Sequence, residues 1–243
     1  MDTEAAGQLG HTVTLSTVGA RGYGLGMRIT HLGHACLLVE IADQRILIDP
    51  GGFAGDFLGL RDLDAVLITH QHADHLDTDR LPALVRANGE VPIWCDPQSV
   101  PVLATLGLEA TAHEGDDVVL GEVTITPFGE MHALIHDDIP RITNVGVRIA
   151  ADGEPTFFHP GDALDADPGQ IDVLAFPLNA PWQASREMTA FLRRLQAPNA
   201  VPMHDALLSQ TGRNLYLKQA GDLGGKDTEI HDLSDGDPWR VEL

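Results

Sequence analysis

The sequence predicts an α/β fold in which two β-sheets pack face to face and helices cover their outer sides. In both halves of the chain, short apolar runs rich in β-branched residues alternate with segments of helical period, a pattern typical of layered α/β proteins. The chain has 243 residues, of which 43% are hydrophobic, so it can bury a large core. It contains no short-period repeat, low-complexity tract or obvious interdomain linker.

The regular pattern begins at Met27, and we expect residues 27–243 to form a single domain. Residues 1–26 are rich in Gly, Ala and Thr and show no helical period. We interpret them as a loose N-terminal leader with at most one short strand near residues 11–15. Deletion of this leader is expected to leave folding intact.

In the first half of the domain, the strand assignments rest on apolar runs bounded by Gly, Pro, Asp and Asn. The first helix rests on Leu81, Leu84 and Val85, which share one helical face. The predicted strands are residues 36–41, 45–48, 65–69, 91–95, 117–120 and 122–126, and the predicted helices are residues 78–87 and 98–106.

The second half repeats this order of elements. Its first two strands are joined by Asp152-Gly153, a dipeptide that favours a tight hairpin turn. The predicted strands are residues 144–150, 156–158, 172–176 and 200–203, and the predicted helices are residues 185–195 and one helix within 206–219.

The charge balance excludes several classes of partner. The formal net charge is −21, with 36 acidic residues against 15 basic ones. Nucleic acids and anionic membranes bind surfaces rich in Lys and Arg, so we expect neither as a partner. The acidic residues are scattered along the chain, which is typical of a solvated surface. A small molecule is the expected substrate, and a homo-oligomer is left open.

The N-terminus carries no basic segment followed by an apolar one, so it does not resemble a secretory signal. No apolar stretch reaches the ~18–20 residues needed to cross a bilayer. Cys36 and Cys95 lie in apolar settings without a CxxC partner, which favours two buried free thiols over a disulfide or a zinc thiolate. We therefore expect a cytoplasmic protein.

A dense group of ligand-type side chains follows one apolar predicted strand, in the segment ITHQHADHLD. Alternate residues of an extended segment face the same way, so His70 and His72 can converge on one ion. Asp74 and His75 follow a turn and can face a second position. Imidazole and carboxylate together suit Zn, Mn, Fe, Co or Ni. A polar turn that caps the next helix through Asp77 or Thr78 is the alternative, but it does not explain three histidines.

Further ligand-type residues follow other apolar runs, namely His132, Asp162 and His204. The carboxyl ends of strands gathered along one sheet edge would bring these residues and the histidine segment together. The sequence therefore predicts a metal site assembled from four separate segments.

Together these segments resemble the metallo-β-lactamase-fold hydrolase superfamily. THQHADHLD resembles its HxHxDH signature, and the later single His, the Asp of HPGDAL and the His of VPMHDAL follow in its order. ITHLGHACLLVE and ILIDPG are similar to its opening, particularly in the branch of L-ascorbate-6-phosphate lactonase and related uncharacterised bacterial hydrolases. The resemblance covers residues 27–217 and implies a four-layer αβ/βα sandwich with a two-metal site at one edge of the sheets.

The resemblance also implies a set of ligands for two divalent ions. The implied ligands are His70, His72 and His132 for the first ion, Asp74, His75 and His204 for the second, and Asp162 shared between them. Zinc is the expected metal, with manganese or iron as alternatives, because imidazole and carboxylate accept all three. Asp74 is also the expected catalytic residue, which would orient the attacking hydroxide and take its proton.

Three residues are expected next to the ligands. Asp49 in ILIDPG would hold a ligand histidine by its other ring nitrogen. His34 in LGHA either contacts the substrate, supports a ligand or is a hydrogen-bonded core histidine. His159 either forms a hydrogen bond near Asp162 or plays no part in the site.

Other candidates receive a different interpretation. His136 is a spare ligand, a substrate proton donor or, as we favour, a loop histidine. His11, His113 and His231 have no supporting context and are interpreted as surface residues. Trp182 could line the pocket, but it is interpreted as a core residue.

The implied function is hydrolysis of a small-molecule ester, lactone, amide or phosphodiester by a hydroxide held between the two ions. A phosphodiesterase or nuclease of the same fold is one alternative, and the acidic composition counts against it. A non-catalytic metal-binding module is another, and the complete ligand set counts against it. A phosphorylated substrate would need an anion site, for which Arg141, Arg148 and Arg186 are the candidates.

Overall fold

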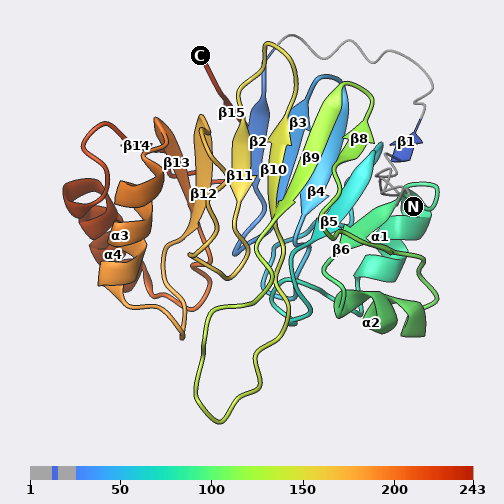
Figure 1. The fold of residues 1–243 in the computed structure, drawn as a ribbon, viewed down its shortest axis with the longest axis horizontal. Coiled ribbons are helices and arrows are strands. Elements are labelled where there is room, and N and C mark those ends of the chain that lie inside the picture. The colour runs from blue at the N-terminus through green and yellow to red at the C-terminus, as the bar shows by residue number, and fades with distance from the viewer. Residues whose placement is uncertain (1–12, 16–25, 243) are drawn as a thin grey trace, which may run out of the picture.

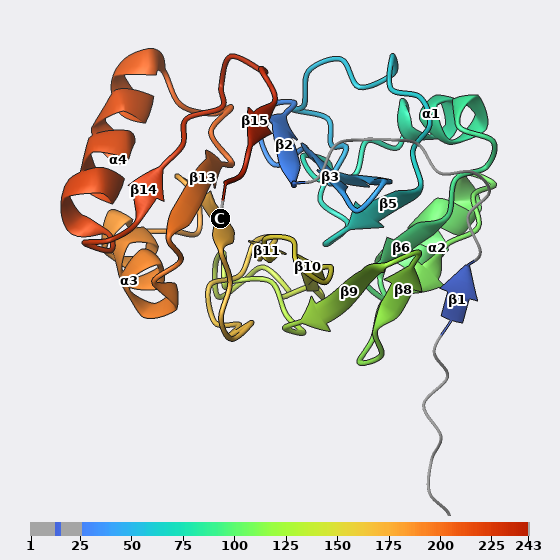
Figure 2. The same cartoon turned by 90° about the horizontal axis from the view of Figure 1, so that it is seen from above.

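The computed structural model describes residues 13–15 and 26–242, which form two β-sheets packed against each other with helices on both outer sides (Figure 1 and Figure 2). One sheet has eight strands and the other has seven. Figure 2 shows helices at each end of this layered arrangement. The predicted α/β sandwich is confirmed.

Each sheet combines strands that are distant in the sequence. From one edge to the other, the eight-stranded sheet consists of β1 (Val13–Leu15), β8 (Val118–Leu120), β9 (Val123–Phe128), β10 (Gly146–Ala150), β11 (Phe157–His159), β12 (Val173–Pro177), β13 (Asn199–Met203) and β14 (Glu229–Ile230). The seven-stranded sheet consists of β15 (Trp239–Arg240), β2 (Arg28–His31), β3 (Leu37–Ile41), β4 (Gln44–Ile48), β5 (Ala65–Ile68), β6 (Ile93–Cys95) and β7 (Thr111–Ala112). The helices are α1 (Leu81–Ala87), α2 (Ser99–Thr105), α3 (Ser185–Leu195) and α4 (Gln210–Leu223).

Three apolar layers hold the sandwich together. In β12, Val173 packs into the layer between the two sheets, whereas the next residue, Leu174, packs into the layer under α3 and α4. In β5, Ala65 faces the other sheet and Val66 faces α1 and α2. Successive side chains of a strand point to opposite faces, so both faces of each central strand are buried. This explains why these strands are continuous apolar runs in the sequence.

Helix α3 shows how sequence period produces a covering helix. Met188, Phe191 and Leu192 lie on one helical face, and all three are buried against the eight-stranded sheet. At its amino end, the Glu187 carboxylate accepts a hydrogen bond of 2.7 Å from the Ala184 N–H, which satisfies a backbone donor that the helix leaves free.

The carboxyl ends of the central strands meet at one edge of the molecule. In one sheet β4, β5 and β6 are parallel, and in the other β11, β12 and β13 are parallel. Strand β9 runs in the direction of β11, because both are antiparallel to β10. The long loop between β9 and β10 projects below the strands in Figure 1. Backbone hydrogen bonds from His204 N to His34 O (2.8 Å) and from Val145 N to Thr69 O (2.9 Å) join the two sheets at this edge.

Some boundaries differ from the predicted ones. The first helix begins at Leu81 rather than at residue 78, because the Asp77 side chain accepts hydrogen bonds from the backbone of Asp79 and Arg80 and forms a separate turn first. Strands β2, β7, β14 and β15 were not predicted. Strand β2 has the polar sequence RITH, and the other three have two residues each, which is too short for a pattern.

The prediction of a loose leader and the surface position of His11 fall on residues 1–12 and 16–25, which lie outside the described residues. Within this leader, Val13–Leu15 is described and forms β1, which runs parallel to β8 at the edge of the eight-stranded sheet. Of the helices in the described part of the chain, none has the length and apolar character that a membrane span requires.

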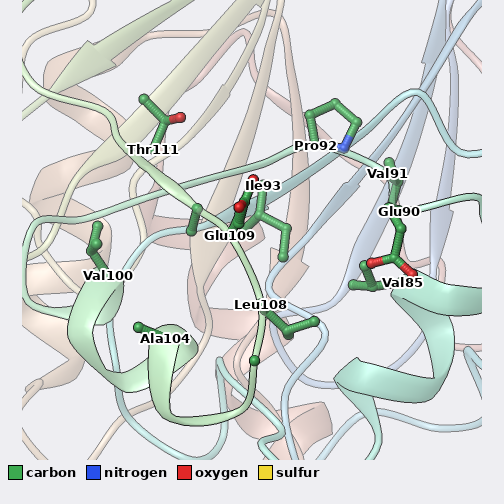
Figure 3. A pocket seen from close by; sticks show the side chains of 12 residues that line it. Val85, Glu90, Val91, Pro92, Ile93, Val100, Ala104, Leu108, Glu109 and Thr111 are labelled. Carbon is green, nitrogen blue, oxygen red and sulfur yellow. The ribbon is translucent and has the colours of Figure 1, made fainter.

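A pocket of about 850 Å³ lies between α1, α2, β6 and β7 (Figure 3). Its lining includes Val91, Pro92 and Ile93 at the amino end of β6. This is the opposite end of the sheet from the gathered carboxyl ends. The pocket is therefore separate from the predicted metal ligands.

Cys36 and Cys95 are free and buried, as predicted. Burial raises the pKa of both thiols, that of Cys95 to about 12, so neither forms the reactive thiolate at about pH 8. We expect a thiol reagent to leave the folded protein unmodified and to react with both cysteines once denaturant is added. Absorbance of the released chromophore measures this, and rapid reaction in native buffer would contradict the described burial.

Candidate metal centre

The edge at which the strands end carries a cluster of histidine and aspartate side chains that contains all seven predicted ligands, with His34 beside Asp74, His75 and His204. The seven predicted ligands come from four loops: His70, His72, Asp74 and His75 follow β5, His132 follows β9, Asp162 follows β11 and His204 follows β13. Their ligand-type atoms form groups in which all atoms lie within 4.8 Å of one another. The structure thus brings together all seven residues of the predicted ligand set.

Asp162 lies between two groups of histidines. Its Oδ1 is 3.2 Å from His75 Nε2, and its Oδ2 is 3.1 Å from His204 Nε2 and 3.4 Å from His132 Nε2. Asp74 lies on the His204 side, with its Oδ2 3.5 Å from His204 Nε2. On the other side, His70, His72 and His132 form a three-histidine group. The arrangement therefore has two halves that share one carboxylate.

Four of these histidines bind protein groups through Nδ1 and present Nε2 to the centre. The Nδ1 partners are Thr69 Oγ1 for His70 (3.0 Å), Asp49 Oδ2 for His75 (2.7 Å), the Ala133 carbonyl for His132 (2.6 Å) and the Asn179 carbonyl for His204 (2.9 Å). Their Nε2 atoms and Asp162 Oδ1 are buried and have no hydrogen-bond partner among the described residues. A buried polar atom without a partner costs about 1–3 kcal/mol, and five such atoms lie in the two halves of this cluster. Imidazole nitrogen and carboxylate oxygen are common ligands of divalent transition metals, so the residues present fit such ions.

The charges of the cluster show the same preference for cations. Burial opposes ionisation of Asp162, but His75 and His204 outweigh it and hold its pKa well below the usual range. Burial likewise opposes protonation of His75 and His204, yet Asp162 raises the pKa of His75 well above its usual value and that of His204 to about 9. Burial lowers the pKa of His70. The buried Asp162 carboxylate thus favours positive charge at the point that these two imidazoles face, which is the charge a bound cation would supply.

Asp49, at the end of β4, orients the loop after β5, which carries His70 and His75. Its carboxylate accepts hydrogen bonds from Thr69 N (2.8 Å), Thr69 Oγ1 (2.7 Å) and His75 Nδ1 (2.7 Å), and it is fully buried. The same Thr69 hydroxyl accepts the Nδ1 hydrogen of His70. One carboxylate therefore fixes the rings of two histidines. Asp49 holds His75 by Nδ1, as the sequence predicts.

Three turns at this edge require unusual backbone angles. Asp49 and His204 directly follow β4 and β13 with φ of 48° and 57°, and His34 has φ of 54°. Residues other than glycine rarely adopt positive φ, and such strain of about 1–3 kcal/mol per residue persists where the surroundings impose it. All three of these residues lie in or beside the cluster.

Two glycines let the chain pack closely against neighbouring backbone or side-chain atoms at the site. A Cβ at Gly51 would lie 1.7 Å from the Asp74 carbonyl oxygen, and one at Gly161 would lie 2.3 Å from Asn144 Oδ1. Gly161 also has φ of 63°, which favours glycine. The motifs DPGG and HPGD therefore need glycine where the Asp74 and Asp162 segments pack.

His34 and His159 occupy different positions. His34 Nε2 donates to Asp74 Oδ2 at 3.1 Å, and His34 Nδ1 accepts from Ala206 N. His34 is therefore beside the second half of the cluster. His159 donates through Nε2 to the Ala35 carbonyl (3.1 Å) and accepts at Nδ1 from Gly161 N. It ties the Asp162 turn to the other sheet.

Other residues at the site were not predicted. Trp182 was interpreted as a core residue, but its indole N–H donates to Asp162 Oδ2 at 2.9 Å and its ring is half-buried. Asn144 accepts from Asp162 N (2.8 Å) and donates to the Pro160 carbonyl. Arg213 binds Asp205, the residue after His204, at 2.7 Å. Only the position of Trp182 after a predicted strand hinted at such a role.

The remaining histidine and arginine candidates do not face the cluster with their ring or guanidinium groups, except Arg141, which contacts the backbone of His132. His113 is buried, not at the surface as predicted, because its segment packs beside β6 with His113 N bound to Cys95 O. His231 is half-buried and stacks on Trp239 at 3.9 Å. The His136 side chain is 64% exposed on its loop, and that of Arg186 is 85% exposed. Arg141 donates to the His132 carbonyl.

A family model described as the beta-lactamase superfamily domain matches residues 28–204, which is most of the chain and includes the whole cluster. The chain therefore belongs to the beta-lactamase superfamily.

Particular relatives are similar over most of their length. Protein Rv0786c of Mycobacterium tuberculosis is 39% identical over 206 residues, covering 84% of this chain and 96% of the relative. A UPF0173 metal-dependent hydrolase of Methanosphaerula palustris is 32% identical over 195 residues, covering 73% of this chain and 83% of the relative. Among solved structures, the metallo-beta-lactamase fold protein YhfI of Bacillus subtilis matches with a TM-score of 0.68 at 19% identity, covering 89% of this chain and 100% of that one. The predicted superfamily is thus confirmed, and the lactonase branch stays a prediction.

Replacing Asp49 by Asn keeps the size of the side chain but removes its charge and one acceptor oxygen. We expect Asp49→Asn to weaken metal affinity about 10–100-fold, because the His75 ring loses its orienting partner. Competition with a chelating dye measures this affinity. Asp222→Asn is the matched control, since Asp222 lies on α4 and pairs with Lys218 at the surface. Equal affinity of Asp49→Asn and the unmodified protein would show that Asp49 orients no ligand.

Proposed function

We propose that this protein is a cytoplasmic metal-dependent hydrolase that acts on a small molecule at a centre of two divalent ions. The observation that carries the proposal is the set of inward-facing Nε2 atoms around Asp162, which make no hydrogen bond of acceptable geometry among the described residues even where Asp162 lies 3.1–3.2 Å away. The similarity to proteins named metal-dependent hydrolases supports the activity. Both cysteines are free and buried, which supports a reducing compartment.

The proposed ligands follow the two halves of the cluster. His70, His72 and His132 would hold one ion, and Asp74, His75 and His204 would hold the other. Asp162 would bind both ions, because its two oxygens face histidines of both halves. Zinc is the proposed metal, since imidazole-rich sites with carboxylates suit it, and manganese or iron would fit the same donors.

Two such ions, when bound, supply a water whose pKa is lowered towards neutrality and a Lewis acid for the carbonyl or phosphoryl oxygen. The protein's own groups then orient the reactants. Burial opposes ionisation of Asp74, but contacts with His204 and His34 lower its pKa, so it stays a carboxylate. Its side chain is 21% exposed, against 3% for Asp162. Asp74 can therefore accept a hydrogen bond from the attacking water and orient it.

The surroundings favour an uncharged ester, lactone or amide over a phosphorylated substrate. Arg186 points into solvent, and the Arg141 Nε is committed to the His132 carbonyl. The chain carries a net charge of −21, which disfavours polyanions such as nucleic acids. We therefore place a phosphodiesterase or nuclease activity second.

His72→Ala removes one ligand of the three-histidine group and is expected to lower bound metal and hydrolysis together. A loss of at least about 100-fold in kcat/KM is expected, because a ligand defines the charge at the reacting centre. Elemental analysis and turnover of an ester, lactone and phosphodiester panel, before and after chelation, measure both effects. His136→Ala is the control, because His136 lies exposed on the loop that follows His132. Full metal content and full turnover of His72→Ala would refute the ligand assignment.

A further inference from the structure

A second pocket, of about 590 Å³, opens beside the metal centre. It lies between the loop after β9, the loop after β11, Trp182 and one face of α3. Its lining includes Ala133 and Ala163, which directly follow the cluster residues His132 and Asp162. The pocket therefore shares its wall with the centre.

Trp182 forms the boundary between the pocket and the cluster. Its Nε1 hydrogen binds Asp162 Oδ2 at 2.9 Å, and its ring lies 5.9 Å from the His132 ring and 6.5 Å from the His204 ring. The same side chain lines the pocket. A group bound in the pocket would thus contact a residue that touches the shared carboxylate.

The lining of this pocket is largely apolar. Met131, Leu134, Leu164, Trp182 and Phe191 supply most of its large side chains. Leu134 is 53% exposed, so water covers an apolar surface that a ligand could cover instead.

The charged residues at the pocket do not form an anion site. The lining contains two acidic residues, Asp165 and Glu187, and one basic residue, Arg194. Arg194 donates to the Leu164 carbonyl and lies over the Phe191 ring at 5.4 Å, while Glu187 caps α3. A carboxylate or phosphate would meet more negative than positive charge here.

Further exposed apolar residues lie on loops at the same edge of the sheets, on the loop after β4 and on two of the loops that carry the cluster. Phe53 is 48% exposed and its ring lies 5.2 Å from the His34 ring. Ile139, on the loop after His132, is 46% exposed, and Leu207, three residues after His204, is 59% exposed. Leu215 and Leu223 on α4 are exposed to a similar degree, so the indication of an apolar ligand rests on the lining of the pocket itself.

We propose that the pocket behind Trp182 binds an uncharged alkyl or acyl chain of the substrate, which makes the substrate class an ester or lactone with an apolar chain. This inference rests on the proposed hydrolase function. In the reaction, the water oxygen bonds to the carbonyl carbon and the bond from that carbon to the alkoxy oxygen breaks. The alkoxy oxygen takes the proton that the water loses and leaves as the alcohol. The chain stays in the pocket throughout and orients the carbonyl at the centre.

The test is a series of p-nitrophenyl esters from acetate to octanoate, hydrolysed by the metal-loaded protein. Each methylene that enters the pocket should raise kcat/KM about fourfold, the factor that corresponds to burying one methylene. Ala190→Trp fills the pocket from the exposed side of α3 and should flatten this increase. Ala83→Trp, on the exposed side of α1, is the matched control and should keep the wild-type increase. Hydrolysis without any dependence on chain length would contradict the proposal that the pocket binds the chain, but it would not contradict the proposed hydrolase function.

A second measurement does not depend on hydrolysis. Calorimetric titration of the metal-free protein with octanol should show binding, which Ala190→Trp should weaken at least about tenfold and Ala83→Trp should not change. If no ester is cleaved but octanol binds in this way, the proposal that the pocket binds an apolar chain is supported and the proposed hydrolytic function is contradicted. Equal octanol affinity of wild type and Ala190→Trp would overturn the pocket.

Discussion

The site depends on one buried carboxylate, Asp49, and on how its hydrogen-bonding capacity is used. It accepts hydrogen bonds from the backbone and hydroxyl of Thr69 and from His75. Through these bonds it fixes the His75 ring directly and the His70 ring through the Thr69 hydroxyl. Because each ring then turns its Nε2 inward, the outer hydrogen bonds determine what the centre can bind. The outward partners of His132 and His204 complete the same pattern from the other sheet.

The apolar layers make this polar cluster possible. Buried polar atoms without partners lower stability, so they persist only where the remaining fold is well packed. The central layer contains side chains of both sheets, and separate layers lie under α1 and α2 and under α3 and α4. These layers fix the strands in register, and parallel strands then deliver their carboxyl-end loops to one edge. Function is thereby confined to loops, which can vary without disturbing the core.

The parts predicted from the sequence are those with a local pattern. Buried strands such as 65–68 are apolar runs, α3 has a clear helical period, and the histidine segment is dense in ligand types. The strand RITH and the two-residue strands lack such a pattern, since their pairing depends on distant segments. Trp182, Asn144 and Arg213 have roles set by tertiary contacts to Asp162 and Asp205. The burial of His113 is likewise tertiary, because nothing in its neighbours along the chain indicates it.

The central claim is that seven side chains from four loops form one centre for two ions that share Asp162. Anomalous diffraction from crystals of the zinc-loaded protein, recorded on both sides of the zinc edge, tests it most directly. The account predicts two anomalous peaks per chain, one among His70, His72 and His132 and one among Asp74, His75 and His204, both in contact with Asp162. A single peak away from Asp162, or zinc bound only at surface residues, would contradict it.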